Sequence, residues 1–598
     1  MGKDIEIDLS AENITILRQI ASGYYDGIFE DFSFKINIGD SEHLIEDLQS
    51  ALSFIYNFNP IKSEDLFIYQ IKPVEKKIEG IKDFLEDVYL PKLKESFSIH
   101  FGDELDEDRV FNLTKNSIEN EKHSILLKKI FDSSFNSNLV NFFNYIFENN
   151  LENDRSFWAK ISSFKGHPLH PFAKLRAPLK EGANELNNFI PELGLEFKVK
   201  ILAIKKNLCK FVFEGSEATF LEAIKRTFNF QEDKYEDCFL IPIHPLELET
   251  YKMLYSEHFA SNDIILTDLE LPVRSNISTR SLIVGNDLGD IKVSLPSYQI
   301  TGGRRVLKSD DIDSIPFINN SIREIISSDQ IISENLRITR ELGGIYFERK
   351  VDKHDLSFIL KASENASLKD SEFSIPLAAF FAFSPTSKKP LIIDFLEHYN
   401  INTESKINSW FACYAEQVIS GQLDLMLKYG VCLEGHQQNS RHIFNKATGM
   451  PISGFAQDIA GGARINKEIF DLNYKLSSKN KLNNYREGNI TYLSEQFNHT
   501  TIGQNLISLA SVLANHIDQD LSKEKFSALK SIIIDKVEES INRCKDHKVE
   551  EGFEKIYKAQ LSEFIFITFG ALSPTKCLSH IAVNQAIKGT FYSNNMLH

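Results

Sequence analysis

The spacing of hydrophobic residues differs between three parts of the chain, and the first part has the period of helices. Apolar residues recur there every three and four positions up to about residue 150, which predicts amphipathic helices. The clearest sets are Leu44, Ile45, Leu48, Leu52, Ile55 and Tyr56, followed by Ile81, Phe84, Leu85, Val88 and Tyr89. No polar cluster with catalytic spacing interrupts them, so we interpret residues 1–150 as a helical scaffold or a dimer surface.

The middle part, residues 151–375, contains apolar residues that alternate with polar ones. Leu195, Phe197, Val199 and Ile201 alternate with charged residues and predict a half-buried strand. A second alternation at 291–295 predicts another strand, with Lys292 and Ser294 on the same face.

The helical period returns in residues 376–598. Residues 409–429 predict one long helix, and Phe526, Leu529, Ile533, Val537 and Ile541 predict another that Ser522 caps. Between these helices, two short apolar runs flank a turn-forming segment at 445–449, which predicts a β-hairpin. The chain is therefore expected to be an α+β protein.

The predicted hairpin carries the densest polar cluster of the chain. Eight residues include Glu434, His436, Gln437, Gln438, Asn439 and Arg441. The return strand ends at Asp458, so the hairpin is expected to bring Asp458 beside Glu434 and Asn439. Two carboxylates and an amide oxygen suit Mg²⁺, with phosphate oxygens completing the shell. The alternative interpretation is a surface hairpin that is merely rich in polar side chains.

Two His-Pro steps at 167–168 and 170–171 predict extended backbone, because a residue before proline avoids the helical region. Pro171 is then a suitable first residue for a helix that carries Lys174. A helix start flanked by His170, Lys174 and Arg176 is a place to hold a carboxylate or phosphate. A zinc site lacks a third ligand nearby, and a rigid turn with satisfied histidines is the structural alternative.

Positive charge is concentrated between Arg274 and Lys308, although the chain has a net charge of −17. Six cations face two acids there, which gives a local balance of +4; the cations are Arg274, Arg280, Lys292, Arg304, Arg305 and Lys308. Arginine forks suit carboxylate and phosphate geometry, and lysine acts as a point charge. We interpret the segment as a cradle for a triphosphate, and a solvated face is the alternative.

Composition limits the classes of function. With 598 residues the chain is too long for one core. The net charge of −17 argues against nucleic acid as a partner. Six scattered cysteines without a CxxC pair favour a reducing compartment. No stretch of about 18 apolar residues predicts a membrane span, and the acidic N-terminus lacks the features of a signal peptide. We therefore expect a cytoplasmic protein with no membrane partner.

Taken together, these segments resemble the siderophore synthetases that act independently of nonribosomal peptide synthetases, the aerobactin-synthetase-like IucA/IucC family. The matches occur in family order over about 300 residues: 166–174, 243–245, Ser278–Arg280, Lys292–Leu295 with 300–305, 434–439 and 458–461. The resemblance implies a cupped-hand shape with a thumb (1–150), fingers (151–375) and a palm (376–598), and ATP between fingers and palm. It also implies that the enzyme adenylates a carboxylate, usually that of citrate, and condenses it with an amine or hydroxyl.

The resemblance assigns roles to individual residues. Nucleotide contacts are implied for Ser278, Thr279, Arg280, Lys292, Thr301, Gln438 and Asn439. Polycarboxylate contacts are implied for His167, His170, Lys174, Arg305 and His436. Of these, His170, Arg305 and His436 are the expected catalytic residues, and Glu434 and Asp458 are the expected ligands of Mg²⁺.

Several positions depart from the family pattern. Gln457 and Lys361 stand where arginine is usual, Gly302 stands where asparagine or serine is usual, and Leu246-Glu247 replaces Trp-Gln. All lie near the expected anion site, so substrate choice stays open and a catalytically weakened binding homologue is one alternative.

A kinase-like phosphotransferase is the other alternative, because His436-x-x-Asn439, a hairpin and Asp458 also resemble the metal loop of aminoglycoside-phosphotransferase-type kinases. That class is disfavoured, since a Gly-rich loop and a Val-Ala-x-Lys strand are missing upstream. The expected co-substrate is a polyamine or amino-alcohol. Homodimers are common in the family, and the sequence leaves the oligomeric state open.

Overall fold

The computed structural model describes residues 9–571, with gaps. The gaps are 26–28, 30–31, 39–40, 58–65, 73–75, 79, 95–104, 136–138, 140, 167–169, 171, 180–183, 229–234, 286–288, 301–302, 350–355, 474–486, 548 and 550–553. His167 and Thr301, two of the expected site residues, therefore lie outside the described residues, as does the side chain of Arg305.

The N-terminal part contains a sheet that the hydrophobic spacing did not predict. Its four antiparallel strands have the order β2-β1-β3-β4 and are β1 (Ser33–Ile38), β2 (Ser41–Ile45), β3 (Leu66–Lys72) and β4 (Lys76–Ile78). The expectation of helices alone was wrong here. Leu44 and Ile45 belong to β2, because Asp47 accepts a hydrogen bond from Ser50 N (2.7 Å) and starts helix α2 (Leu48–Asn57) only after them.

The other described elements of the N-terminal part are helices, and they lead to the middle of the chain. They are α1 (Leu9–Tyr25), α3 (Ile81–Phe84), the π-helix η2 (Leu85–Tyr89), α5 (Glu107–Ser133), α6 (Phe142–Glu148) and α7 (Arg155–Lys165). Asp154 caps α7 by accepting hydrogen bonds from the amides of Ser156 (2.9 Å) and Phe157 (3.0 Å). This cap fixes the direction of α7, which forms one wall of the candidate site.

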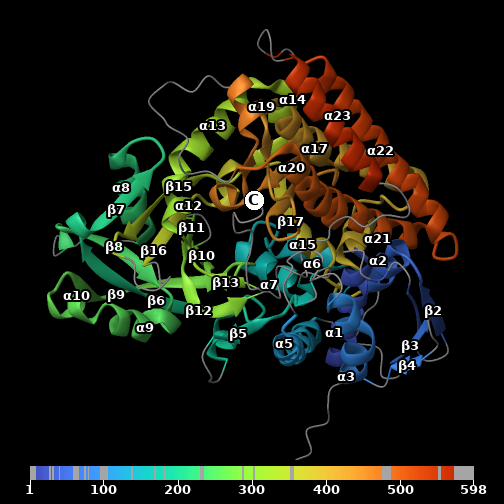
Figure 1. Cartoon of the computed structure of the whole chain (residues 1–598), viewed down its shortest axis with the longest axis horizontal. Helices are drawn as coiled ribbons and strands as arrows, with labels where there is room; N and C mark the ends of the chain where they lie inside the picture. The colour runs from blue at the N-terminus through green and yellow to red at the C-terminus, as the bar shows by residue number, and fades with distance from the viewer. Residues whose placement is uncertain are drawn as a thin grey trace, which may run out of the picture.

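The middle part is built on an eight-stranded antiparallel sheet with the order β7-β15-β16-β11-β10-β9-β6-β8. Its strands are β6 (Glu196–Lys205), β7 (Cys209–Phe213), β8 (Cys238–Ile243), β9 (Ile264–Ser275), β10 (Ser281–Val284), β11 (Gly289–Val293), β15 (Glu341–Phe347) and β16 (Ser357–Lys361). The two strands predicted from alternation are β6 and β11. This sheet forms the left side of the molecule in Figure 1.

Smaller elements complete the middle part. A three-stranded sheet, β13-β12-β5, consists of β5 (Arg176–Pro178), β12 (Leu295–Ile300) and β13 (Gly303–Arg305). The helices are α8 (Glu217–Phe228), α9 (Leu248–Leu254), α10 (Ser256–Ala260), α12 (Ser309–Asp313), α13 (Ile315–Ser328) and α14 (Gln330–Asn335). Short 3₁₀ turns are η3 (Glu185–Phe189), η4 (Lys206–Leu208), η6 (Pro245–Glu247) and η7 (Glu364–Ser367).

The C-terminal part contains the predicted hairpin and the two predicted helices. The hairpin strands β19 (Ser440–Asn445) and β20 (Pro451–Ala456) are antiparallel and lie between β14 (Leu336–Ile338) and β17 (Glu372–Pro376). The long helix is α17 (Glu404–Tyr429), and Gly430 ends it in the left-handed conformation (φ 70°), which turns the chain sharply into the polar loop. The second helix is α22 (Ser522–Lys545), which has Leu521 rather than Ser522 at its cap position.

The remaining C-terminal elements pack around these. They are α15 (Leu377–Phe380), α16 (Leu391–His398), β18 (Val431–Cys432), α18 (Ile459–Gly462), β21 (Arg464–Ile465), α19 (Lys467–Asn473), α20 (Ile490–Phe497), the π-helix η8 (Asn498–Ile507), α21 (Ser508–Ile517) and α23 (Glu554–Ala571). In the part of the chain that the structure describes, we find no helix with the length and apolar character needed to cross a membrane.

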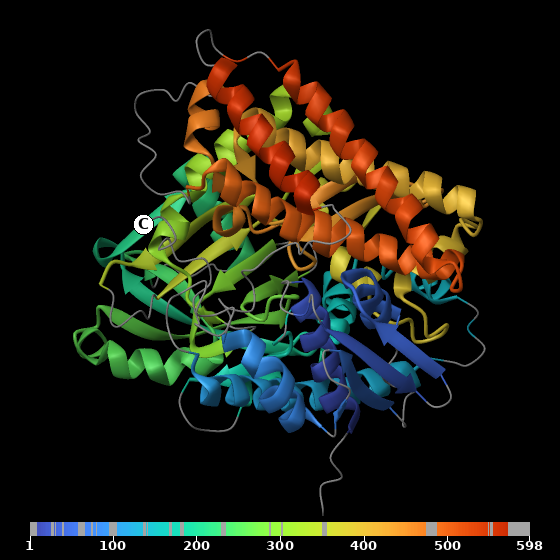
Figure 2. The same ribbon diagram turned by 45° about the vertical axis from the view of Figure 1, so that its right-hand side comes forward.

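One hydrophobic core joins the two ends of the chain. It runs from Ile16 in α1 to Phe564 in α23. Helix α2 packs against α21, and Tyr56 Oη donates a hydrogen bond to Ser508 Oγ (2.8 Å) across this contact. Figures 1 and 2 both show the N-terminal elements beside the C-terminal helices. The mixed α+β class is confirmed, whereas the division into thumb, fingers and palm stays a prediction.

Candidate active site

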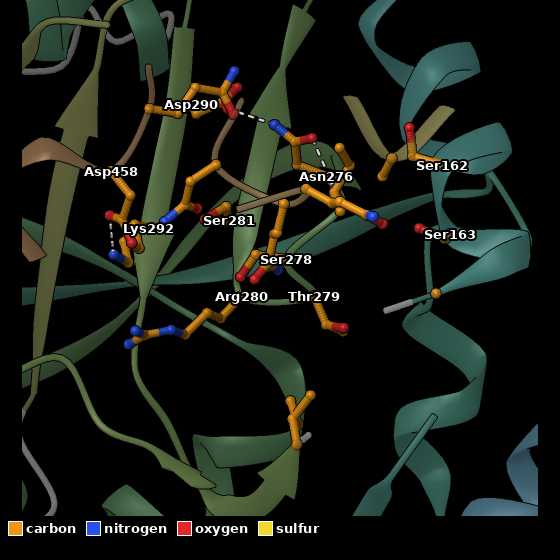
Figure 3. Close-up of a pocket in the computed structure, with 18 of the residues that line it drawn as sticks. Ser162, Ser163, Asn276, Ser278, Thr279, Arg280, Ser281, Asp290, Lys292 and Asp458 are labelled. Atoms are coloured by element: carbon orange, nitrogen blue, oxygen red, sulfur yellow. Dashed lines mark hydrogen bonds and ion pairs between the residues drawn. The ribbon is translucent and has the colours of Figure 1, made fainter. Parts of the chain in front are cut away.

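A pocket lies where the middle sheet, the hairpin and α7 meet. Residues from the turn 276–281, from β11 and β16, from the loop 437–439 and from Gln457 and Asp458 line one side of it. Residues of α7 and of the segment 173–176 line the other side. Figure 3 shows α7, with Ser162 and Ser163, facing the turn that carries Ser278 and Thr279. The predicted polar segments therefore meet in one place, although they are far apart in sequence.

The predicted Ser278-Thr279-Arg280 segment forms the tight turn between β9 and β10. The turn is fixed by its backbone: Ser281 N donates to Ser278 O (2.8 Å), and Val293 N donates to Arg280 O (3.0 Å). The Arg280 side chain extends toward the side of the pocket where Lys292 and Asp458 lie (Figure 3). The turn thus places the hydroxyls of Ser278 and Thr279 and the guanidinium of Arg280 at the pocket.

Lys292 and Lys361 project from neighbouring strands, β11 and β16, and we call them the sheet-side cations. Both contact Asp458, which follows β20: Lys292 Nζ forms an ion pair with Asp458 Oδ1, and Lys361 Nζ lies 3.1 Å from the same oxygen. Burial lowers the pKa of Lys292 to about 8, against the opposing effect of Asp458. Although burial would raise it, these lysines hold the pKa of Asp458 well below its usual range.

The backbone of Asp458 is strained. Its φ of 57° and ψ of 50° lie in the left-handed region, where non-glycine residues are uncommon and aspartate is among the most tolerated. It stands immediately before the short helix α18, and in this conformation its carboxylate contacts the sheet-side cations. Such outliers cluster at functional sites, because the surrounding structure must hold them in place.

The loop 434–439 supplies the second predicted carboxylate. Arg464 Nη2 donates to Glu434 Oε1 (3.0 Å), and Asn439 Nδ2 lies 3.5 Å from Glu434 Oε2. His436 Nδ1 accepts a hydrogen bond from Gln438 N (3.2 Å), and His436 Nε2 lies 3.7 Å from Glu434 Oε2. The neutral imidazole therefore carries its proton on Nε2. Glu434 and His436 lie beside the pocket rather than in its lining.

The donor set for magnesium fits the ion chemically. Each carboxylate lies beside one of two consecutive glycines: a Cβ on Gly461 would lie 3.5 Å from the Asp458 oxygens, and one on Gly462 would lie 3.5 Å from Glu434 Oε2. Among the described residues no group of three or more acids, histidines or cysteines forms a complete metal site. A metal here would need oxygens from a phosphate as well, as expected from the residues of the hairpin.

Lys174 and Arg176, which we call the loop-side cations, are organised differently. Both contact one oxygen of the fully buried Glu192, at 3.0 Å from Lys174 Nζ and 2.5 Å from Arg176 Nη2. Lys174 Nζ also donates to Ser124 Oγ (2.9 Å) and to Ser163 O. Because an ammonium has three donors, Lys174 has none left for a ligand. Lys174 is thus held by protein partners in this structure, and its expected contact with the substrate stays a prediction.

Glu192 shows how strongly the loop-side cations act on their counter-ion. Burial would raise its pKa, but Arg176 and Lys174 outweigh burial and lower the pKa to about 2. Arg176 Nη1, in contrast, is buried and makes no hydrogen bond in the described structure. His170 lies nearby in sequence and is buried, and its Nδ1 accepts a hydrogen bond from Phe172 N (3.1 Å).

Sequence patterns missed the buried ionic network behind the pocket. Arg155 of α7 pairs with Asp290 of β11, and Asn276 Nδ2 donates to Asp290 Oδ2 (2.9 Å) and to Glu364 Oε1 (3.3 Å). Glu364 in turn forms an ion pair with Arg441 of β19 (2.8 Å). No local motif signals this network, since its five members come from five separate segments.

The positions that depart from the family pattern have identifiable contacts. Lys361 pairs with Asp458 and with the buried Glu341 (3.2 Å). Glu247 accepts hydrogen bonds from Ser297 N (2.9 Å) and Ser297 Oγ (2.8 Å), which ties η6 to β12. Gln457 N donates to Asn439 O (2.9 Å). Gly302 lies outside the described residues.

Comparisons with known proteins find similar proteins for most of the chain. The IucA / IucC family model matches residues 160–382, and a model described as ferric iron reductase FhuF-like transporter matches residues 408–526. The chain is 24% identical to D-ornithine–citrate ligase of Staphylococcus aureus, over 54% of each chain. It is 22% identical to a citryl-spermidine:spermidine ligase of Bacillus anthracis, over 73% of this chain and 67% of that one. The chain spans about half the length of the first curated relatives that it matches.

Solved structures show the same fold. Petrobactin biosynthesis protein AsbB from Bacillus anthracis aligns over 93% of this chain and 91% of its own, with a TM-score of 0.64 and 17% identity. ATP-bound aerobactin synthetase IucA from Klebsiella pneumoniae aligns over 89% and 92%, with a TM-score of 0.62 and 13% identity. The motif order and these matches agree with the resemblance to the IucA/IucC family, whose model covers residues 160–382 of this chain.

Proposed function

We propose that this chain is an ATP- and Mg²⁺-dependent ligase of siderophore biosynthesis. It adenylates a carboxylate of a citrate-like acid and condenses the product with an amine or a hydroxyl to give an amide or an ester. The observation that carries this proposal is the pocket itself. Although the chain is acidic overall, Arg280, Lys292 and Lys361 line this pocket together with one carboxylate, Asp458.

The proposed reaction explains why such a pocket is useful. A carboxylate oxygen attacks the α-phosphorus of ATP, the bond to the β,γ-phosphates breaks, and pyrophosphate leaves. Two anions meet in this step, so cations in a partly buried site are needed to screen them. The amine or hydroxyl then attacks the acyl carbon, AMP leaves with the former carboxylate oxygen, and the nucleophile loses a proton.

Residues around the sheet are assigned to the nucleotide. In the proposal Arg280, Lys292 and Lys361 contact the phosphates, while Ser278, Thr279, Gln438 and Asn439 supply hydrogen bonds. Thr301 keeps this role from the family resemblance alone. Glu434 and Asp458 would hold Mg²⁺, which supplies charge neutralisation at the phosphates.

A second set of residues is assigned to the acid. His170, Arg305 and His436 are proposed to hold the polycarboxylate, together with His167. His436, whose Nδ1 accepts a hydrogen bond from Gln438 N, is proposed to orient the acyl group by donating a hydrogen bond from Nε2. The acid is expected to be citrate-like and the nucleophile a polyamine or amino-alcohol, because the relatives are named as citrate and spermidine ligases.

An exchange assay tests this proposal. Labelled pyrophosphate is incubated with ATP, Mg²⁺ and one of citrate, 2-oxoglutarate, succinate or a citryl monoamide, and incorporation of label into ATP is measured. We expect acid-dependent exchange that Arg305→Ala and Asp458→Asn abolish. Arg274→Ala is the matched control, since its half-exposed side chain pairs with Glu196 outside the pocket. ADP formation without exchange would instead indicate a phosphotransferase.

A further inference from the structure

The two sheet-side cations meet on a single oxygen. Lys292 from β11 and Lys361 from β16 both contact Oδ1 of Asp458, and the contact between Lys292 and Asp458 is drawn in Figure 3. The lysine side chains are 5% and 8% exposed, whereas that of Asp458 is 25% exposed. The carboxylate is thus the most accessible member of the group, and it faces the pocket.

This arrangement opposes a metal ion at Asp458. A divalent cation that approached Oδ1 would come within a few ångströms of two ammonium groups that solvent screens poorly. It would also have to replace two charge-assisted hydrogen bonds. The same carboxylate therefore has two competing uses, as the counter-ion of the lysines and as a metal ligand.

A buried acid keeps Lys361 at the pocket. Glu341 is fully buried, and its Oε1 lies 3.2 Å from Lys361 Nζ. Glu341 Oε2 accepts a hydrogen bond from Ala460 N (2.7 Å) in the helix that Asp458 begins. Lys361 consequently has a second counter-ion that holds it in place if Asp458 changes partner. The space beside the pair is open, since Gly461 has no side chain there.

On the basis of the proposed function, we propose that Lys292 and Lys361 act as an interlock on the metal site. In the absence of a polyphosphate they occupy Asp458 and exclude a divalent cation. A triphosphate supplies anionic oxygens that take over both lysines, which frees Asp458 to bind the metal that arrives with or after the nucleotide. Lys361, a position where the sequence departs from the family pattern, is thereby a phosphate-binding residue.

The interlock predicts the metal affinity of the protein alone. Free Mn²⁺ is titrated against the full-length protein without nucleotide, and bound metal is measured by electron paramagnetic resonance. We expect at least about tenfold tighter Mn²⁺ binding in Lys361→Met than in the wild type. Lys292→Met should show the same change, so a folding defect in one variant does not decide the outcome. Lys205→Met, which removes a surface lysine paired with Asp263, should bind Mn²⁺ as the wild type does.

Two further experiments distinguish failure of the interlock from failure of the proposed ATP site. The gained Mn²⁺ site should disappear when Asp458→Asn is added to Lys361→Met. In calorimetry with EDTA present, tripolyphosphate should bind the wild type and bind Lys361→Met at least about tenfold more weakly. Equal Mn²⁺ affinity in the wild type and both lysine variants, or a gained site that survives Asp458→Asn, would overturn the interlock. No tripolyphosphate binding to the wild type would instead count against the proposed ATP site.

Discussion

The two pairs of cationic side chains around the pocket differ in the burial of the carboxylate that they share. The loop-side cations, Lys174 and Arg176, share Glu192, which is fully buried. The sheet-side cations, Lys292 and Lys361, share Asp458, which is 25% exposed and faces the pocket. An ion pair with a buried partner is fixed, whereas an ion pair with an accessible partner can exchange it for a ligand. Burial of the counter-ion therefore separates structural cations from candidate ligand-binding ones.

The comparison predicts that loss of Glu192 has the largest effect on stability. Glu192→Gln leaves Lys174 and Arg176 buried without their common counter-ion, which should cost about 3–5 kcal/mol in the free energy of unfolding. Urea denaturation at pH 7 measures it. The control is Glu270→Gln, which removes a surface acid between Lys198 and Lys200 and should change the free energy of unfolding far less.

The pH dependence of stability tests whether the charge of Glu192 is responsible for this effect. The pKa of Glu192 is about 2 in the folded protein, compared with an ordinary value of 4.5. Its stabilisation is therefore complete above about pH 4.5 and is lost as the pH falls toward 2. The difference in unfolding free energy between wild type and Glu192→Gln should shrink over this range. A difference that is constant from pH 7 to pH 3 would contradict the ion-pair explanation.

Lys292→Met should reverse the pattern, with a large effect on activity and a small one on stability. Loss of one phosphate-binding cation is expected to reduce pyrophosphate exchange by about 100-fold. Asp458 keeps Lys361 as a partner, so the midpoint of urea denaturation should change little. The comparison would fail if Lys292→Met unfolded as readily as Glu192→Gln.

Tyr56→Phe tests whether the N-terminal part supports the pocket. Tyr56 Oη accepts a hydrogen bond from Gln437 Nε2 (2.8 Å), and Gln437 Nε2 also donates to Gln504 O (2.9 Å). The variant also loses the hydrogen bond from Tyr56 Oη to Ser508 Oγ, so stability should fall by about 2 kcal/mol, at about 1 kcal/mol for each bond. It should also reduce exchange activity by a few-fold, because Gln437 lines the pocket. Tyr145→Phe, on half-buried α6, is a control that should leave activity unchanged.

Lys361→Arg should have the smallest effect. Arginine keeps the positive charge between Asp458 and Glu341 and restores the residue that is usual in the family at this position. We expect pyrophosphate exchange within about fivefold of wild type, whereas Lys361→Met should lose far more. If Lys361→Arg lost as much exchange activity as Lys361→Met, the geometry of the lysine side chain rather than its charge would determine the activity.

The sequence predicted elements with strong local signals. The turn at 445–449 and its flanking apolar runs correspond to the hairpin β19–β20, and the periodic segment 409–429 lies within α17. Alternation identified β6 and β11 because one face of each strand is exposed or lines the pocket. The small N-terminal sheet was missed, because residues 44–56 keep a helical spacing across the strand-to-helix boundary at Asp47.

Contacts between distant segments were less predictable. The motifs indicated that Arg280, Lys292 and Asp458 belong to one site, and the pocket contains all three. The motif that contains Lys174 gave no sign that Glu192, 18 residues further along, would engage its ammonium group. Glu341 and Tyr56 likewise carry no motif, since their roles arise only from packing. The proposed roles of His170, Arg305 and His436 remain predictions.

Transfer of an oxygen atom tests the central claim most directly. The acid is labelled with ¹⁸O in its carboxylates and incubated with the enzyme, ATP, Mg²⁺ and a polyamine, and the products are examined by mass spectrometry. If the pocket supports adenylation, one ¹⁸O atom per turnover appears in AMP. The label appearing in inorganic phosphate with ADP as the other product, or no transfer while amide forms, would contradict it.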